Sequence, residues 1–264
     1  MNTKAILFDL DGVFYEGERP IPGASSVIGW AREKGIPYLF ITNTSSRPRR
    51  ALVDKLARLG IDADIDHLLT PPLAAAEWLK THVNGPVALF VPDATRGEFS
   101  GLTEWETEQD GPAAAVVVGD LGERWDFATL NRAFRLLMQD RKPAFVALGM
   151  TRYWKAPDGL RLDTAPFVVA LQHASGVEPL VLGKPAKPFF QAASDSLGVP
   201  LSECLMVGDD IRGDIEGAQR AGLRAVLVKT GKFQEQDLET GIEPDGVIAS
   251  VSDLPAWWKT TRVR

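Results

Sequence analysis

The stretch Ala5-Ile6-Leu7-Phe8-Asp9-Leu10-Asp11-Gly12-Val13 decides the fold, because an apolar run ends there in two carboxylates and a glycine. A short run of apolar residues is typical of a parallel strand that is buried on both faces. Open α/β sheets bind ligands where their strands end. Two neighbouring carboxylates at such an edge repel each other unless a cation or a proton resolves the charge. The stretch therefore predicts a binding site, although Asp and Gly also serve in exposed turns.

The bulk properties narrow the class of protein. The chain has 264 residues and a net charge of -6, which gives no general attraction to nucleic acid or to an anionic membrane. None of its apolar stretches approaches the ~20 residues that span a bilayer. The segment before Ala5 leaves no room for a signal peptide, so we expect a cytoplasmic protein. Cys204 is the only cysteine, and we expect it to pack in a core.

Apolar runs alternate with amphipathic stretches, which predicts βαβ units and a mostly parallel sheet. Turn formers and acidic residues gather from about residue 84 to 112, and the motif spacing leaves a long insertion there. We therefore predict a second domain at 79–178, inserted into a first domain made of 1–78 and 179–264. The predicted strands are Ala5–Phe8, Pro37–Thr42, His67–Thr70, Val87–Val91, Ala113–Gly119, Ala144–Leu148, Leu180–Leu182, Cys204–Val207, Ala225–Val228 and Gly246–Ile248. The predicted helices lie near Ala24–Lys34, Arg49–Leu59, Ala74–His82, Phe127–Gln139, Ala165–Ala174, Pro188–Leu197, Asp214–Ala221 and Ser252–Lys259.

Three further predicted strands end in polar side chains, as the first one does. Parallel strands place all four ends at one edge of the sheet. Carboxylates are ligands for Mg²⁺, a lysine suits a phosphate oxygen, and a hydroxyl and an amide can donate hydrogen bonds to it. No histidine belongs to the set, so we expect an aspartate nucleophile that forms an acyl-phosphate. The set consists of Asp9, Asp11, Thr42, Asn43, Lys184, Asp209, Asp210 and Asp214.

This arrangement resembles the haloacid dehalogenase superfamily of phosphotransferases, in its nitrophenylphosphatase (NagD) type with a large cap. Four signature motifs occur in order: the segment from Asp9 to Val13, then Thr42, then Lys184, and last Asp209 with Asp214 in the form GDxxxxD. The resemblance covers nearly the whole chain. It implies an α/β fold in which a Rossmann-like, doubly wound parallel sheet forms the core and an α/β cap domain is inserted into it.

The resemblance also implies catalytic roles. Asp9 attacks phosphorus and becomes an aspartyl-phosphate, while Asp11 protonates the leaving oxygen and afterwards activates the water. Thr42, Asn43 and Lys184 bind the phosphoryl group. The Thr42 hydroxyl could instead cap the following helix.

Metal ligands follow from the same resemblance. Mg²⁺ is expected on the side chains of Asp9 and Asp209 and on the backbone carbonyl of Asp11. Asp210 and Asp214 would hold metal-bound waters or the motif-three lysine. As an alternative, both could cap the helix that follows them.

We therefore expect a Mg²⁺-dependent phosphatase that hydrolyses a small phosphorylated substrate. A related subgroup often has Ser where this chain has Asp11, so the retained acid favours phosphomonoesters. Hydrolysis of pyrophosphate or of phosphoramidates such as phospholysine and phosphohistidine is the alternative, and a non-catalytic module that binds a phosphorylated ligand is the second alternative. Arg152, Tyr153 and Trp154 could contact the substrate or lie at a domain edge. We expect no nucleic-acid or membrane partner, and a homodimer fits the family resemblance.

Overall fold

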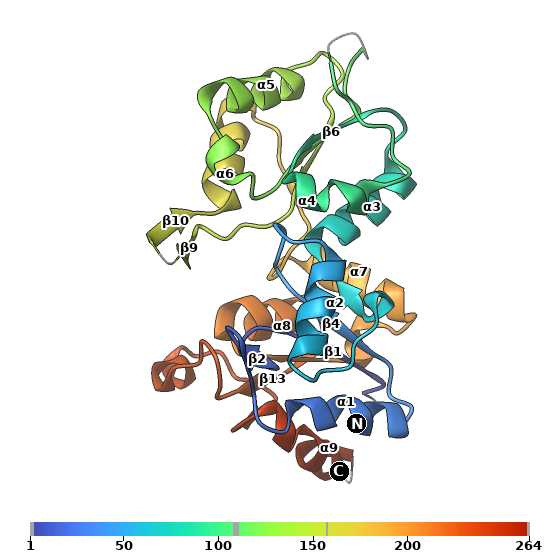
Figure 1. Cartoon of the computed structure of the whole chain (residues 1–264), viewed down its shortest axis with the longest axis vertical. Coiled ribbons are helices and arrows are strands. Elements are labelled where there is room, and N and C mark those ends of the chain that lie inside the picture. Colours follow the sequence, from blue (N-terminus) through green and yellow to red (C-terminus); the bar gives the residue numbers. More distant parts are fainter. Residues whose placement is uncertain (1–2, 108–110, 157, 263–264) are drawn as a thin grey trace. The chain divides into compact units, whose positions relative to one another are not determined.

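The computed structural model describes residues 3–107, 111–156 and 158–262, and it divides the chain into two compact units (Figure 1). The first unit consists of Met1–Thr42, Arg49–Leu69 and Lys184–Arg264. The second consists of Asn43–Pro48 and Thr70–Gly183. The second unit is thus inserted into the sequence of the first. A division at residue 79 would cut the helix Pro71–His82, which lies wholly in the second unit.

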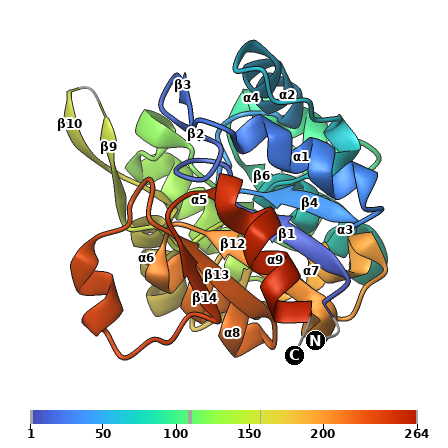
Figure 2. The same ribbon diagram turned by 90° about the horizontal axis from the view of Figure 1, so that it is seen from below.

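A six-stranded sheet runs through the first unit. Its strands are β1 (Ala5–Phe8), β4 (Tyr38–Ile41), β5 (Leu68–Leu69), β12 (Cys204–Gly208), β13 (Arg224–Val228) and β14 (Gly246–Ile248). They are ordered β14-β13-β12-β1-β4-β5, and each neighbouring pair is parallel. Figure 2 shows β14, β13, β12, β1 and β4 in this sequence. Every residue of β1, β4 and β12 is buried, because helices cover both faces of the sheet.

The helices of the first unit lie on the two faces of this sheet. They are α1 (Ala24–Glu33), α2 (Arg49–Arg58), α7 (Lys187–Leu197), α8 (Gly217–Ala221) and α9 (Leu254–Arg262). Val27, Leu52 and Trp258 come from α1, α2 and α9, and they share one apolar core with β1 and β4. The buried phenylalanines of α7 lie outside that core, and α7 contacts β4 while α8 contacts β13. This two-sided cover is the doubly wound arrangement.

The second unit has a parallel sheet of its own. Its strands are β6 (Val87–Phe90), β7 (Ala115–Val118), β8 (Ala144–Ala147) and β11 (Leu180–Val181), in the order β11-β8-β7-β6. The prediction that all four motif strands share one sheet was therefore wrong for the strand before Lys184, because β11 pairs with β8. Its helices are α3 (Pro71–His82), α4 (Asp93–Arg96), α5 (Phe127–Leu137) and α6 (Thr164–Ser175). Helices α5 and α6 contact each other and β7. The second unit is therefore also α/β, as expected for the inserted domain.

Two hairpins are absent from the sequence prediction. In the first unit β2 (Tyr15–Glu16) pairs with β3 (Arg19–Pro20), and in the second unit β9 (Tyr153–Ala156) pairs with β10 (Gly159–Leu162). The strands of the first hairpin are too short to show an alternating pattern. Those of the second are mostly exposed on both faces, so they carry no pattern of burial. Hydrophobic periodicity therefore predicts neither hairpin.

Helical turns fill several connections. The helix predicted from Asp214 begins earlier, in a π-helical turn over Ile211–Glu216 that continues into α8. The 3₁₀ turns are Ile65–His67, Gly97–Phe99, Gly122–Arg124, Leu201–Glu203, Glu235–Glu239 and Val251–Asp253.

An aromatic cluster holds the loop after β1 against the sheet. Phe14 is fully buried and meets Phe8 and Phe40 edge to face, with ring centroids 5.3 Å and 5.1 Å away. Edge-to-face contacts add to the free energy gained by burying these rings. Phe14 thus anchors the segment that directly follows Asp11 and Gly12.

We predict that Phe14→Ala lowers the free energy of unfolding by about 3–5 kcal/mol, because it leaves a cavity in this cluster. Urea unfolding followed by circular dichroism measures the loss. Phe127→Ala is the control: its side chain is 83% exposed, so the change should stay within about 0.5 kcal/mol. Equal losses in the two variants would contradict the role given to the cluster.

Candidate active site

The pairing of β1 with β12 brings the first and fourth motifs together. Phe8 is the register partner of Val207, and the backbone N–H of Asp9 donates to the carbonyl of Val207 at 2.9 Å. Both strands therefore end at the same level, with Asp9 following one and Asp209 closely following the end of the other. Two carboxylates that are two hundred residues apart in sequence become neighbours through this backbone register.

Asp9, Asp209 and Asp214 form a buried carboxylate cluster with Lys184. The ammonium of Lys184 lies 2.6 Å from Oδ1 of Asp9 and 2.7 Å from Oδ1 of Asp214. One carboxylate oxygen from each of the three aspartates lies within 4.8 Å of the others. All four side chains are buried. Three carboxylates and one ammonium leave an excess of negative charge, which is expensive in a low-dielectric site.

The two carboxylate oxygens of Asp209 differ in their hydrogen bonding. Its Oδ2 accepts a hydrogen bond from the backbone N–H of Lys232 at 2.7 Å, whereas its buried Oδ1 has no hydrogen-bond partner among the described residues. Burial, together with repulsion from Asp9 and Asp214, raises the pKa of Asp209 to about 8. A buried carboxylate oxygen without a donor, beside two further carboxylates, is a suitable ligand for a hard divalent cation.

Lys184 keeps its charge in this setting. Burial alone would lower the pKa of its ammonium, but the carboxylates of Asp214 and Asp9 raise it above the ordinary value. Burial raises the pKa of Asp214 to about 6, while its ion pair with Lys184 opposes the shift. Asp214 therefore orients the lysine through Oδ1, while its Oδ2 accepts a hydrogen bond from the N–H of Asp210 at 3.3 Å.

Asp210 has a different role. Its Oδ1 accepts hydrogen bonds from the backbone N–H groups of Arg212 and Gly213, at 3.0 Å and 2.8 Å, so it caps the π-helical turn. Its Oδ2 lies 3.3 Å from the ammonium of Lys232. Burial opposes a low pKa for Asp210, but the Gly213 N–H and the Lys232 charge lower it below the ordinary value. The capping alternative raised by the sequence therefore describes Asp210.

Asp11 and Thr42 occupy the same edge of the first unit. Asp11 is exposed. Partial desolvation of its carboxyl raises its pKa, and repulsion from Asp9 acts in the same direction, whereas the charge of Lys55 opposes the shift. Thr42 is buried directly after β4, and its N–H donates to the carbonyl of Leu69 at 3.3 Å. Asn43 belongs to the second unit, so its place beside the phosphoryl group stays a prediction.

The backbone conformation of Gly12 explains why the first motif contains a glycine. Its φ of 85° lies in the left-handed region, where other residues are strained. A Cβ atom at this position would collide with the carboxylate of Asp209. The glycine therefore allows the backbone to approach the fourth motif closely.

The turn Thr230-Gly231-Lys232 also belongs to the site, and the sequence reasoning gave it no role. The hydroxyl of Thr230 donates to the carbonyl of Gly12, and the N–H of Gly231 donates to Glu16 at 2.9 Å. Together with the bond from Lys232 to Asp209, these contacts fasten the turn to both carboxylate motifs. The turn begins two residues after the end of β13, a strand next to β12, and this position near a strand end is the signal that could have revealed it.

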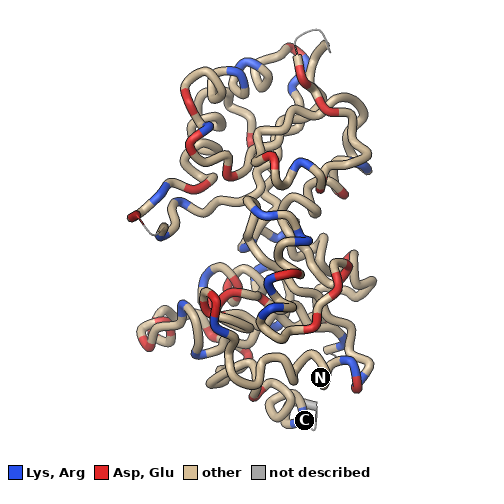
Figure 3. The backbone as a smooth tube through the Cα atoms, in the orientation of Figure 1, with Lys and Arg blue, Asp and Glu red and all other residues tan. Residues whose placement is uncertain are grey.

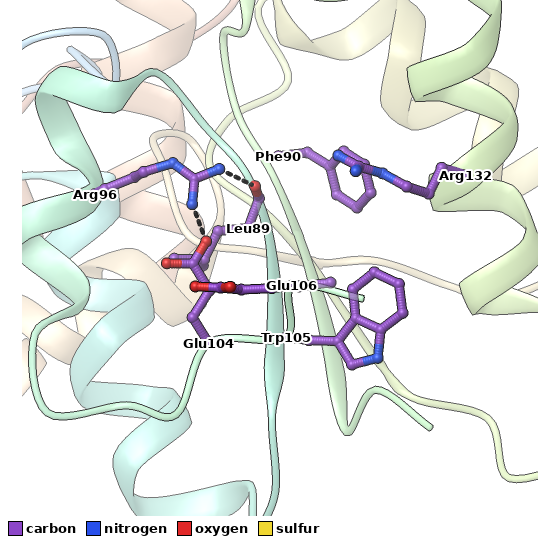
Figure 4. A pocket seen from close by; sticks show the side chains of 8 residues that line it. Leu89, Phe90, Arg96, Glu104, Trp105, Glu106 and Arg132 are labelled. Carbon is purple, nitrogen blue, oxygen red and sulfur yellow. Dashed lines mark hydrogen bonds and ion pairs between the residues drawn. The ribbon is translucent and has the colours of Figure 1, made fainter. Parts of the chain in front are cut away.

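The second unit contains a separate small cavity of about 200 Å³, shown in Figure 4. Arg96 makes an ion pair with Glu104 there and donates to the carbonyl of Leu89 at 3.3 Å. The guanidinium of Arg132 lies 5.2 Å from the ring centroid of Phe90. The cavity is lined by Ala88, Leu89, Phe90, Arg96, Glu104, Trp105, Glu106 and Arg132. None of the predicted site residues lines it.

Other surface features bear on partners. Tyr153 and Trp154 are exposed on β9, at 52% and 42%, and Arg152 directly precedes them. Positively and negatively charged residues alternate along the backbone of both units, as Figure 3 shows. Within the described part of the chain, every helix is too short or too polar to cross a bilayer.

Comparisons with known proteins place the chain in a family. A family model described as "Haloacid dehalogenase-like hydrolase" matches residues 6–102, and a second one, described as "HAD-hydrolase-like", matches residues 181–254. The human phospholysine phosphohistidine inorganic pyrophosphate phosphatase is 35% identical over 256 residues, which are 95% of this chain and 92% of that protein. The haloacid dehalogenase-like hydrolase domain-containing protein 2 of Bos taurus is 37% identical over 241 residues, which are 91% of this chain and 89% of that protein.

Solved structures share the fold over almost the full length. The p-nitrophenyl phosphatase from Archaeoglobus fulgidus has a TM-score of 0.87 at 27% identity, with 97% of this chain and 100% of that chain covered. NagD from E. coli K-12 has a TM-score of 0.84 at 24% identity, with 96% and 98% covered, and it supports the fold alone. The predicted fold class and the resemblance based on four motifs are thereby confirmed. This chain belongs to the haloacid dehalogenase-like hydrolase family.

Proposed function

We propose that this chain is a Mg²⁺-dependent phosphatase that hydrolyses a small phosphorylated substrate through an aspartyl-phosphate on Asp9. One observation carries the proposal: the buried carboxylate of Asp9 is held 2.6 Å from the ammonium of Lys184 and beside Asp209. A nucleophile for phosphorus needs neighbouring positive charge, since its substrate is itself an anion. Family membership and relatives that are named as phosphatases support the reaction class.

The first step uses Asp9 and Asp11. A carboxylate oxygen of Asp9 forms a bond to phosphorus while the bond from phosphorus to the leaving oxygen breaks, and Asp11 gives its proton to that oxygen. In the second step Asp11 takes a proton from water, whose oxygen attacks the phosphorus and releases Asp9 and inorganic phosphate. Lys184 stabilises the negative charge on the phosphoryl oxygens. Thr42 and Asn43 are proposed to donate hydrogen bonds to the same oxygens.

The carboxylate cluster fits Mg²⁺. The side chains of Asp9 and Asp209 and the backbone carbonyl of Asp11 would hold the ion. Oxygen-only ligands and the buried Asp209 Oδ1 without a donor match the preference of Mg²⁺. When bound, the ion would neutralise carboxylate charge and stabilise charge on the transferring phosphoryl group.

A second candidate reaction is the hydrolysis of pyrophosphate or of phosphoramidates. The observation that favours it is the 35% identity to a relative with that name. The acid Asp11 favours phosphomonoesters, because an alkoxide is a poor leaving group and depends on receiving a proton, whereas a good leaving group depends on it less. Rates on p-nitrophenyl phosphate, an alkyl phosphate, pyrophosphate and phospholysine, measured side by side, separate the two candidates.

We also propose an oligomeric state and a cellular location. A homodimer fits the family resemblance, and a cytoplasmic location fits a chain with a single cysteine. Sedimentation velocity at several protein concentrations measures the first, and imaging of the tagged full-length protein measures the second.

Asp9→Asn should remove turnover of p-nitrophenyl phosphate while the fold stays intact, because the amide is a poor nucleophile. The expected loss in kcat is at least about 10³-fold, measured as p-nitrophenolate release with Mg²⁺ present. Asp66→Asn, an exposed substitution in the same unit, is the control and should keep full activity. Half the wild-type rate in Asp9→Asn would show that the nucleophile is misassigned. A folded wild-type protein that binds phosphopeptides tightly without turnover would instead favour the non-catalytic module.

Asp209→Asn should stabilise the metal-free protein at pH about 8. The pKa of Asp209 is raised to about 8 in the folded state, against about 4 in an unfolded chain. The folded state therefore binds the extra proton between these values, and the Asp209 contribution becomes increasingly destabilising as the pH rises through this window. With a chelator present, the Tm of Asp209→Asn minus that of the wild type should grow from pH about 5 to about 8.

Added Mg²⁺ should reverse this ranking, since a ligand that binds only the folded state raises its Tm. The wild type should gain stability and recover the activity lost to the chelator, while Asp209→Asn should gain little. A wild-type Tm and rate that do not respond to the chelator or to Mg²⁺ would contradict the metal site.

A further inference from the structure

Lys55 is a buried charge that the proposed reaction does not use. Among the residues that the structure describes, five charged side chains are buried, and four of them form the carboxylate cluster with its lysine. Lys55 is the fifth, with 8% of its surface exposed. Burying an ammonium without a partner is strongly unfavourable, so its position requires an explanation.

The position of Lys55 on α2 is one where the fold offers an apolar environment. Leu52 and Leu56, three residues before and one after it, are buried on the inner face of the same helix. Residues at this spacing share the stripe that a helix turns toward the core. A leucine at residue 55 would continue that stripe at no electrostatic expense.

The ammonium of Lys55 contacts the β2–β3 hairpin. It lies 3.9 Å from the ring centroid of Tyr15 and 3.7 Å from Oε1 of Glu18. Tyr15 is itself buried, at 5% exposure, so the cation–π contact is desolvated and correspondingly strong. Glu18 is exposed, and its ion pair adds less.

The same hairpin determines where Asp11 lies. The N–H of Gly12 donates to the carbonyl of Tyr15 at 2.7 Å, and Asp11 makes an isolated bridge with Tyr15. On its other flank the loop is tied down by Thr230, whose hydroxyl donates to the carbonyl of Gly12. The backbone of Asp11 is thus held between the turn after β13 and the Tyr15–Lys55 contact.

We propose that Lys55 is a positioning residue: by holding Tyr15 and the β2–β3 hairpin, it keeps Asp11 in place to protonate the leaving oxygen. The inference rests on the acid role of Asp11 in the proposed function. It predicts a defect of a particular kind. A displaced acid slows substrates in proportion to their need for a proton, whereas a damaged nucleophile or a weakened fold slows all substrates alike.

The experiment compares kcat/KM on p-nitrophenyl phosphate, whose leaving group departs readily without a proton, and on an alkyl phosphate, whose alkoxide requires one. Lys55→Met should lose about tenfold more on the alkyl phosphate than on p-nitrophenyl phosphate, a fraction of the 10²–10⁴-fold that general acids contribute. Lys55→Arg, which keeps a cation over the ring, should restore the wild-type ratio in large part. Lys4→Met is the control, since it removes an exposed lysine paired with Glu203 and should leave the ratio unchanged.

Asp11→Asn separates this inference from the proposed function. If Asp11→Asn selectively loses the alkyl phosphate and Lys55→Met loses both substrates equally, the positioning role is overturned and the acid role stands. If Asp11→Asn also loses both equally, the acid role itself fails. Should Lys55→Met not fold, Tyr15→Leu removes the same contact from the other side. An unchanged substrate ratio in folded Tyr15→Leu overturns the proposal.

Discussion

The buried cluster of Asp9, Asp209, Asp214 and Lys184 is the constraint on which the rest of the structure depends. Parallel pairing of β1 with β12 forces the carboxylates together, and the lysine offsets only part of their charge. The remaining charge makes the site unfavourable by itself. The same excess suits a divalent cation and, through it, an anionic phosphoryl group. The features that weaken the metal-free fold are therefore those that the reaction uses.

The surrounding fold compensates for this unfavourable site. Fully buried strands and the Phe8, Phe14 and Phe40 cluster stabilise the sheet next to the carboxylates. Gly12 allows the loop to approach Asp209, and the turn after β13 fastens it there. The site is thus held by backbone contacts from several strand ends, so that its side chains are fixed before a substrate binds. Such preorganisation is the main means by which proteins stabilise phosphoryl transfer.

Much of this arrangement could be predicted from the sequence, because its signals are local. Apolar runs that end in Asp or Thr mark strand ends of the six-stranded sheet, and parallel pairing then brings Asp9, Thr42 and Asp209 to one edge. Lys184 differs, because the strand before it, β11, pairs with β8 in the sheet of the second unit. The sequence could not show that Asp210 caps the helical turn and that Asp214 pairs with Lys184, since either residue could serve either purpose. Lys55 was missed for another reason. A lysine in a helix is ordinarily solvated, and only the position of Tyr15 shows that this one is buried.

The most direct measurement of the central claim is anomalous diffraction from crystals of the full chain grown with Mn²⁺, which binds oxygen ligands as Mg²⁺ does. We expect one strong anomalous peak between the carboxylates of Asp9 and Asp209, in contact with the Asp209 Oδ1 that has no hydrogen-bond donor among the described residues. The peak should vanish in Asp209→Asn. Saturating Mn²⁺ with no peak at these carboxylates, in crystals of active protein, would contradict the account.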